Sequence, residues 1–174
     1  MPRLPARRLL LATLLLLGAC ASSNQAPLPT VAAVDLGRYA GTWYEIALLP
    51  TWFERNCASD TQAHYRLDGD EVEVVNSCRR ADGQVESATG HAHAAEGSGN
   101  AKLRVSFFRP FYADYWVLAL DPSYTHVLVG EPGRQYAWIL SRTPLLDAAA
   151  REALLARAQA LGFDRAAFRL TPQH

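Results

Sequence analysis

The sequence of 174 residues lacks the features that mark several large classes of protein. Its three cysteines are too few for a zinc site with four sulfur ligands, and no suitably spaced histidine adds to them. Its 17 basic residues balance 17 acidic ones, and no basic stripe with interleaved aromatic residues indicates a nucleic-acid partner. It has no Gly-x-Ser-x-Gly elbow, no Ser/His/Asp order and no internal repeat. What remains is a single small domain without a motif for nucleophilic catalysis.

The N-terminus has the pattern of an export signal. Arg3, Arg7 and Arg8 precede an apolar run over 9–17, which is shorter than the about 20 residues that span a membrane. We therefore predict that residues 1–19 are a signal peptide. Setting these three arginines aside leaves 14 basic and 17 acidic residues, so the body of the protein is mildly acidic.

A cysteine follows this signal directly. The segment Leu17-Gly18-Ala19-Cys20 resembles the lipobox of bacterial lipoproteins, in which the cysteine thiol is lipidated and cleavage occurs before it. The resemblance implies lipidation of Cys20, a lipidated tether over 20–34 and a membrane anchor. Because Ala21 resembles the pattern of outer-membrane lipoproteins, we expect a lipid-anchored protein on the periplasm-facing side of the cell outer membrane. The alternative is an ordinary signal peptide in which Cys20 has no role.

Two further cysteines remain in the body of this exported chain. An even number of cysteines in an oxidising compartment favours a disulfide, here between Cys57 and Cys78. Such a bond closes a loop of roughly 20 residues and contributes about 3 kcal/mol. Two free thiols, or a metal pair, are the alternative.

Between positions 42 and 142 the sequence has the pattern of short strands separated by turn residues, which is typical of an all-β sandwich or barrel. We predict strands over 42–49, 61–67, 71–78, 85–94, 102–108, 114–120, 125–130 and 135–142. Eight consecutive strands with mostly short connections favour an eight-stranded antiparallel up-and-down barrel, because closure removes the exposed edges.

The pattern changes to a helical period after the last strand. Asp147 is placed as an N-cap before a helix over 148–161, and Gly162 follows as a stop. The apolar residues that recur at helical spacing are Leu154, Leu155, Ala158 and Leu161. We expect this single C-terminal α-helix to pack outside the barrel, and a last extended piece over 167–171 to join a barrel edge.

The first and last predicted strands carry a complementary pair of side chains. Trp43 opens the first strand, and Arg142 closes the last. These strands become neighbours in a closed barrel, where an indole and a guanidinium stack with a gain of roughly 0.5–2 kcal/mol. We predict that Trp43 and Arg142 together seal one end of the barrel.

Strand alternation predicts which side chains point into the barrel. The expected ligand-binding lining is Ala47, Tyr65, Val74, Asn76, Val105, Phe107, Tyr115, Val117, Val129, Tyr136 and Trp138. The same alternation assigns Glu45, Leu49 and Ala119 to the inner face. A lining that is apolar and aromatic, with a few hydroxyl and amide groups, suits a molecule with a long hydrocarbon part and a small polar head. The alternative is an interior filled by side chains.

Three segments resemble the conserved blocks of the lipocalin family. They are Asp35-Leu36-Gly37-Arg38-Tyr39 with Gly41-Thr42-Trp43-Tyr44-Glu45-Ile46-Ala47, then Leu118-Ala119-Leu120-Asp121 with Tyr124, then Trp138-Ile139-Leu140-Ser141-Arg142-Thr143-Pro144. The run over 102–112 also resembles the bacterial subgroup. The order of the three blocks, together with the lipobox, is similar to the bacterial outer-membrane lipocalins, which also resemble apolipoprotein D and the plant temperature-induced lipocalins. The resemblance implies a lipocalin domain over 35–174.

The resemblance further implies a membrane-anchored carrier that stores or transports fatty acids or lysophospholipids, without catalysis and without a cofactor. The alternatives are an enzyme on the same scaffold, acting on a small hydrophobic substrate, and an envelope interaction module with a filled barrel. Glu45 as a catalytic acid lacks a visible partner, and a metal site at His91 and His93 lacks a third ligand. The sequence leaves open whether a homodimer forms across the barrel mouth.

Overall fold

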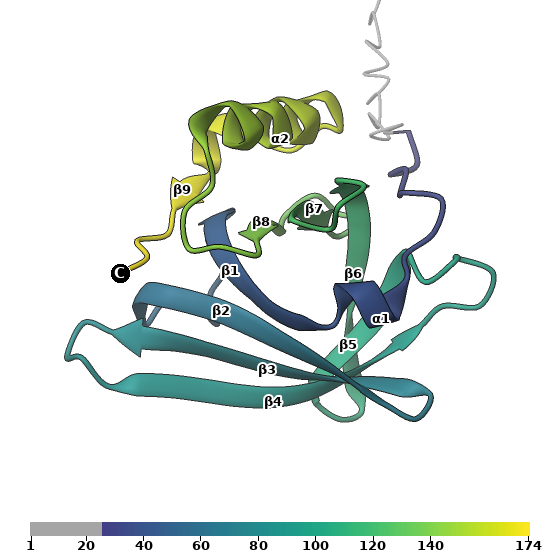
Figure 1. Ribbon diagram of the computed structural model, residues 1–174, viewed down its shortest axis with the longest axis horizontal. Coiled ribbons are helices and arrows are strands. Elements are labelled where there is room, and N and C mark those ends of the chain that lie inside the picture. Colours follow the sequence, from purple (N-terminus) through teal and green to yellow (C-terminus); the bar gives the residue numbers. More distant parts are fainter. Residues whose placement is uncertain (1–25) are drawn as a thin grey trace, which may run out of the picture.

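The computed structural model describes residues 26–174, so the predicted signal peptide and Cys20 lie outside the described residues. The elements in chain order are α1 (Leu36–Tyr39), β1 (Gly41–Leu48), β2 (Cys57–Asp68), β3 (Glu71–Arg80), β4 (Val85–Ala94), β5 (Lys102–Phe108), β6 (Phe111–Leu120), β7 (His126–Gly130), β8 (Ala137–Ser141), α2 (Ala148–Ala160), the short 3₁₀ helix η1 (Arg165–Ala167) and β9 (Arg169–Leu170) (Figure 1).

Strands β1 to β8 form a closed antiparallel barrel. Each strand pairs with the next along the chain from β2 to β8, β8 pairs with β1, and β1 pairs with β2. The closing pairing runs from Gly41 opposite Tyr65 to Tyr44 opposite Gln62. The predicted fold class, an eight-stranded up-and-down barrel with one helix outside, is therefore confirmed.

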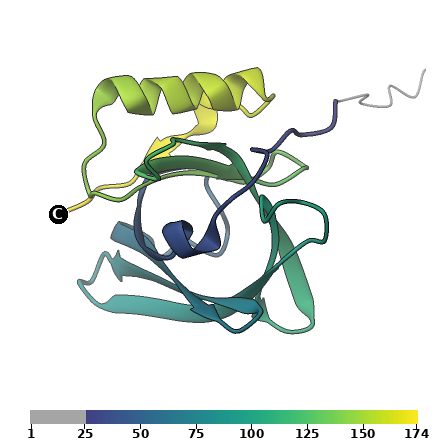
Figure 2. The same ribbon diagram turned by 45° about the vertical axis from the view of Figure 1, so that its right-hand side comes forward.

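The two ends of the barrel differ. Alternate connections of an up-and-down barrel lie at the same end, so the loops 49–56, 81–84, 109–110 and 131–136 surround one end, which we call the mouth. At the opposite, closed end, α1 lies within the ring of strands when the barrel is viewed along its axis (Figure 2). The carboxylate of Asp35 accepts a hydrogen bond from the Arg38 N–H and so caps this one-turn helix.

Helix α2 packs against the outside of the wall, above β7 and β8 (Figure 1). Asp147 caps it as predicted, accepting from the Ala150 N–H at 2.9 Å. The predicted apolar stripe is buried in an outer cluster with side chains from β1, β6, β7 and β8. Gly130 lets the helix region come close, because a Cβ at this position would lie 2.7 Å from the Phe163 ring.

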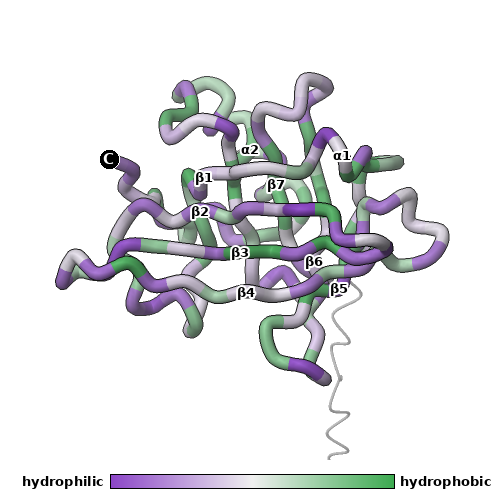
Figure 3. Tube along the Cα trace, turned by 60° about the horizontal axis from the view of Figure 1, so that its bottom comes forward, coloured by the Kyte–Doolittle hydropathy of each residue, from purple (hydrophilic) through white to green (hydrophobic). Residues whose placement is uncertain are grey.

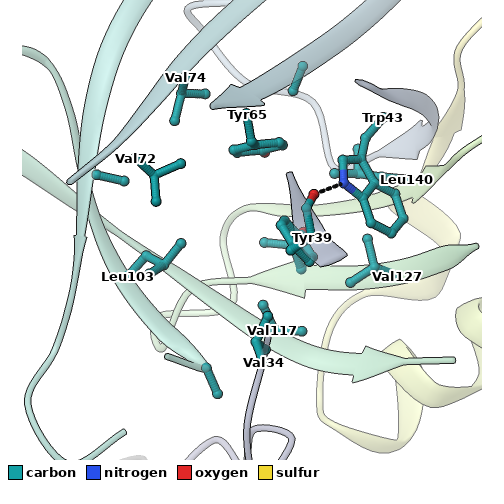
Figure 4. Close-up of a cluster of buried hydrophobic side chains, with 14 residues drawn as sticks. Val34, Tyr39, Trp43, Tyr65, Val72, Val74, Leu103, Val117, Val127 and Leu140 are labelled. Carbon is teal, nitrogen blue, oxygen red and sulfur yellow. Dashed lines mark hydrogen bonds between the residues drawn. The ribbon is translucent and has the colours of Figure 1, made fainter. Parts of the chain in front are cut away.

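A second cluster fills the lower interior of the barrel. It contains Tyr39 from α1, Trp43 from β1 and inward side chains from the other strands (Figure 4). Hydrophobic and hydrophilic residues alternate along β3, as expected for a wall with one face inside and one in water (Figure 3). The helix therefore stabilises the wall from outside, while the barrel has a core of its own.

Two β-bulges reverse the alternation and overturn part of the predicted lining. The register shifts between Glu45 and Ala47 in β1, so Ala47 and Leu49 belong to the outer cluster under α2. A second shift between Val117 and Ala119 in β6 places Ala119 in the same outer cluster. The prediction that Ala47 lines the interior is therefore wrong, because the extra residue of a bulge moves every later side chain to the other face.

The C-terminal segment covers the gap where β1 and β2 diverge. Strand β9 pairs with β1, as the sequence predicted for its last extended piece. Beyond it the Thr171 N–H donates to the Ile46 carbonyl at 3.0 Å, and the Gln173 amide donates to the Glu45 and Thr61 carbonyls. The seam of the barrel is thus held by hydrogen bonds from a third segment.

Candidate functional site

The closed end is sealed by Arg142 and Trp43. The Arg142 guanidinium lies 4.0 Å from the Trp43 ring centroid, and the Trp43 indole N–H donates to the Tyr39 carbonyl at 2.8 Å. The same guanidinium donates to the carbonyls of Thr42, Arg38, Tyr39 and Tyr124 at 2.7–3.3 Å. One side chain therefore ties α1, β1 and the β6–β7 loop together and blocks passage through this end.

Three tyrosines form a hydrogen-bonded chain above this floor. The Tyr115 hydroxyl bonds those of Tyr39 at 2.7 Å and Tyr65 at 2.9 Å. Burial raises the pKa of Tyr65 to about 12 and the pKa values of Tyr39 and Tyr115 well above their ordinary range, so all three phenols are neutral. Because three hydroxyls share two bonds, one O–H proton has no acceptor within residues 26–174 and is free for a water or ligand oxygen.

Inward side chains become more accessible from the floor toward the mouth. Val117, Val129 and Val74 are buried inside the barrel. The inward residues nearer the mouth are half-buried or exposed, namely Asn76, Val105, Tyr115, Tyr136, Trp138 and Phe107. Phe107 is 44 % exposed and lies over Gly90, where a Cβ would meet its ring at 2.8 Å. The inward side chains nearer the mouth are therefore accessible to water, and most of them are apolar or aromatic.

One polar atom in this lining is unpaired. The Asn76 side-chain oxygen is buried and has no hydrogen-bond partner in the described part of the chain. A buried amide oxygen without a donor costs about 1–3 kcal/mol, so it favours a ligand or water that supplies one.

Loop 49–56 folds an aromatic side chain over the mouth. Phe53 lies with its ring centroid 5.9 Å from Tyr136 and 6.4 Å from Trp138, and Trp52 packs edge-on against Phe53. Tyr136 and Trp138 themselves stack at 6.4 Å. Tyr136 and Trp138, both assigned to the last predicted strand over 135–142, thus contact Phe53, a loop residue to which strand alternation does not apply.

A pair of carboxyl groups fastens this loop to the wall. The Glu54 carboxylate accepts from the Thr51 hydroxyl at 2.8 Å and from the Trp138 indole N–H at 3.2 Å. Glu45, which is 3 % exposed, accepts from the Thr171 hydroxyl and lies near the Glu54 carboxylate. Burial, and then the charge of Glu54, raise the pKa of Glu45 to about 8. Glu45 therefore holds a proton at neutral pH, and its contacts connect structural elements.

The two body cysteines are bonded to each other. Cys57 at the start of β2 and Cys78 near the end of β3 form a disulfide, which confirms the predicted pair. The bond lies toward the mouth, where β2 runs past the end of its pairing with β1. It stabilises the base of loop 49–56.

A family model described as a lipocalin-like domain matches residues 34–173, which is most of the chain.

This chain belongs to the lipocalin family.

Its relatives include the outer membrane lipoprotein Blc of Escherichia coli, which is 42 % identical over 135 residues covering 77 % of this chain and 76 % of that protein. Temperature-induced lipocalin-1 of Arabidopsis thaliana is 37 % identical over 82 % of this chain and 81 % of its own length. Bovine apolipoprotein D is 40 % identical over 64 % of this chain and 62 % of its own length. The resemblance to these three kinds of lipocalin is therefore confirmed.

Solved structures agree on the architecture. Insecticyanin from the tobacco hornworm superposes with a TM-score of 0.67 at 25 % identity over 83 % of each chain. Lobster apocrustacyanin A1 gives a TM-score of 0.66 at 17 % identity, over 85 % of this lipocalin and 91 % of that chain, and so supports the fold alone.

Sequence reasoning missed two contributors to the site. Tyr39 enters from α1, which strand alternation does not cover, and Glu54 enters from loop 49–56. The signal available for the loop is its composition, since Trp52, Phe53 and Glu54 follow a proline where a solvent-exposed loop is expected to be polar.

Two surface features of the lipocalin are not part of this site. His91 lies 3.7 Å from Glu71, and His93 packs against the Tyr112 ring. No group of three His, Cys, Asp or Glu side chains within residues 26–174 is placed to hold a metal ion. Within these residues no helix is both long enough and apolar enough to cross a bilayer.

Proposed function

We propose that this lipocalin is a lipid-binding carrier of the cell envelope, which holds one fatty acid or lysophospholipid in the upper part of its barrel. The observation that carries the proposal is the gradient of exposure along the inward face. Side chains near the floor are buried, while Val105, Tyr136, Trp138 and Phe107 remain accessible from the mouth. An apolar and aromatic lining of this kind suits a hydrocarbon chain.

The polar groups of the site support a ligand with a head group. The spare tyrosine proton and the unpaired Asn76 oxygen supply one donor and one acceptor among otherwise apolar walls. A few polar groups in an apolar pocket fix the orientation of a ligand without adding chemistry. Glu45 and Glu54 are engaged by Thr171, Thr51 and Trp138, so we assign them no catalytic role.

The relatives support the anchor and the location. Blc is named an outer membrane lipoprotein in both Escherichia coli and Vibrio cholerae. Cys20 follows a lipobox-like segment in this chain. We therefore propose that Cys20 is lipidated and that the barrel stands on the periplasmic face of the outer membrane. The predicted tether over 20–34 is shorter than expected, because Leu28 and Val34 are packed against the barrel, and we propose that only the part before Ala26 serves as the tether.

A volume-filling substitution tests the interior site. Val105→Trp places an indole in the upper interior, while Val75→Trp places the same group on the outer face of β3, where alternation directs Val75. Displacement of a fluorescent fatty acid, and separately of a lysophospholipid, measures the affinity. We expect at least a tenfold loss, or about 1.4 kcal/mol, for Val105→Trp alone. Equal affinity in both variants, with both folded, contradicts the proposal.

A further inference from the structure

The N-terminal segment leaves the barrel at the mouth. Val34 lies at the closed end, where its N–H donates to the Gly99 carbonyl at 2.8 Å. The segment then runs back along the wall, with Leu28 buried in the outer cluster and the Ala26 carbonyl accepting from the Arg134 guanidinium at 2.7 Å. Arg134 belongs to loop 131–136, one of the four loops around the mouth. In chain order, the first described residue is therefore fixed at the open end.

Hydrogen bonds from Arg134 hold this part of the N-terminal segment in place. Besides Ala26, its guanidinium donates to the Leu161 carbonyl at 2.6 Å and the Pro132 carbonyl at 3.2 Å. The segment at 26–28 is thus tied both to a mouth loop and to the end of α2. Figures 1 and 2 show it passing the α2 side of the barrel on its way out.

The distance from this point to the proposed anchor is short. Ala26 is six positions after Cys20, and an extended chain spans at most about 3.6 Å per residue, or about 22 Å in all. If Cys20 carries acyl chains, Ala26 and loop 131–136, which holds it, lie within about that distance of the bilayer surface.

The rim of the mouth carries exposed aromatic side chains. Trp52 is 70 % exposed in loop 49–56, and Phe108 and Phe111 are 76 % and 71 % exposed beside turn 109–110. Phe108 and Phe111 stack on each other with their centroids 6.2 Å apart. Exposed aromatic residues gathered at one end of a protein mark an interaction surface, and Trp and Phe favour the membrane interface.

We propose that the barrel stands mouth-down on a phospholipid bilayer, with Trp52, Phe108 and Phe111 inserted at the interface. The inference rests on the proposed function, because it takes the anchor at Cys20 and the lipid site in the interior as given. The tether and the rim are independent observations, and both point to the same end. A lipid then passes between bilayer and barrel without crossing water.

Two single-tryptophan additions test the orientation. Phe108→Trp adds an indole at the rim, and Leu145→Trp adds one at the other end, where Leu145 follows β8 and is 82 % exposed. Full-length protein purified from membranes, with acylation verified by intact mass, is reconstituted into vesicles of phosphatidylethanolamine, phosphatidylglycerol and brominated phosphatidylcholine. Bromine quenches indoles that enter the bilayer. We expect loss of the added fluorescence in Phe108→Trp and none in Leu145→Trp.

Other outcomes overturn the proposal. Equal quenching in the two variants, no quenching in either, or an unmodified Cys20 each contradicts the mouth-down arrangement. A rim protected because two copies pair mouth to mouth, seen as a dimer mass in native mass spectrometry, contradicts it as well. Fatty-acid titration of the same variants in solution reports the interior site separately. Full affinity with an unquenched rim would therefore refute the orientation and leave the carrier function standing.

Discussion

Replacing Arg142 with alanine tests whether its contacts stabilise the closed end of the barrel. The guanidinium stacks on Trp43 at 4.0 Å and donates to four carbonyls. The stack contributes about 0.5–2 kcal/mol. Each hydrogen bond adds about 0.5–1.5 kcal/mol, reduced here because carbonyls near the surface regain water. We expect Arg142→Ala to lower the free energy of unfolding by about 3 kcal/mol, which at this chain length lowers Tm by roughly 6–12 °C.

Two matched variants separate the network from charge alone. Arg142→Lys keeps the positive charge but cannot make the planar set of bonds, so we expect about half the loss. Arg104→Ala removes an exposed arginine that pairs with Asp114 at 3.5 Å, and such pairs contribute about 0–1 kcal/mol. Urea unfolding followed by far-ultraviolet circular dichroism measures all three variants without depending on Trp43 fluorescence. If Arg142→Ala unfolds at the same urea concentration as the parent, the guanidinium does not hold this end together.

Three further changes test other parts of the structure. Because the pKa of Glu45 is raised to about 8 from an ordinary 4.5, the folded state keeps a proton that the unfolded state releases, and stability falls as pH rises between those values. That loss is on the order of 3–5 kcal/mol. Glu45→Gln should remove it, and urea midpoints with the same pH dependence in both proteins would contradict this. Replacing Cys57 and Cys78 by serine should cost about 3 kcal/mol, and a Tm equal to that of the oxidised parent would refute it. Gly130→Ala should cost about 1–3 kcal/mol, because the new Cβ meets Phe163, and Phe163→Leu should restore part of the loss; an unchanged melting curve counts against that contact.

Regular patterns in the sequence predict most of the fold. Alternation and turn residues such as Gly69 and Gly83, both at positive φ, locate the strands, and the helical spacing with its Asp147 cap locates α2. The ends of strands are less well predicted. Strand β2 begins at Cys57 rather than 61, and β6 at Phe111 rather than 114, because pairing with a neighbouring strand extends them past the apolar pattern.

The site is harder to predict than the fold. Alternation correctly places Tyr65, Val74, Val105 and Val117 on the inner face. In these strands no β-bulge separates the residue from the neighbours whose alternation was used to assign the faces. It fails at Ala47, since a bulge depends on tertiary packing under α2 and leaves no mark in the local pattern. Glu54 lies in a loop and Tyr39 in α1, so the alternation of strand residues cannot predict where their side chains point.

The most direct test of the carrier function is native mass spectrometry of the protein extracted from membranes without unfolding, followed by analysis of its lipids. We predict a single fatty acid or lysophospholipid bound per chain in the parent and in Val75→Trp, and none in Val105→Trp. A parent protein free of lipid, or lipid retained equally by Val105→Trp, would contradict a binding site inside the barrel.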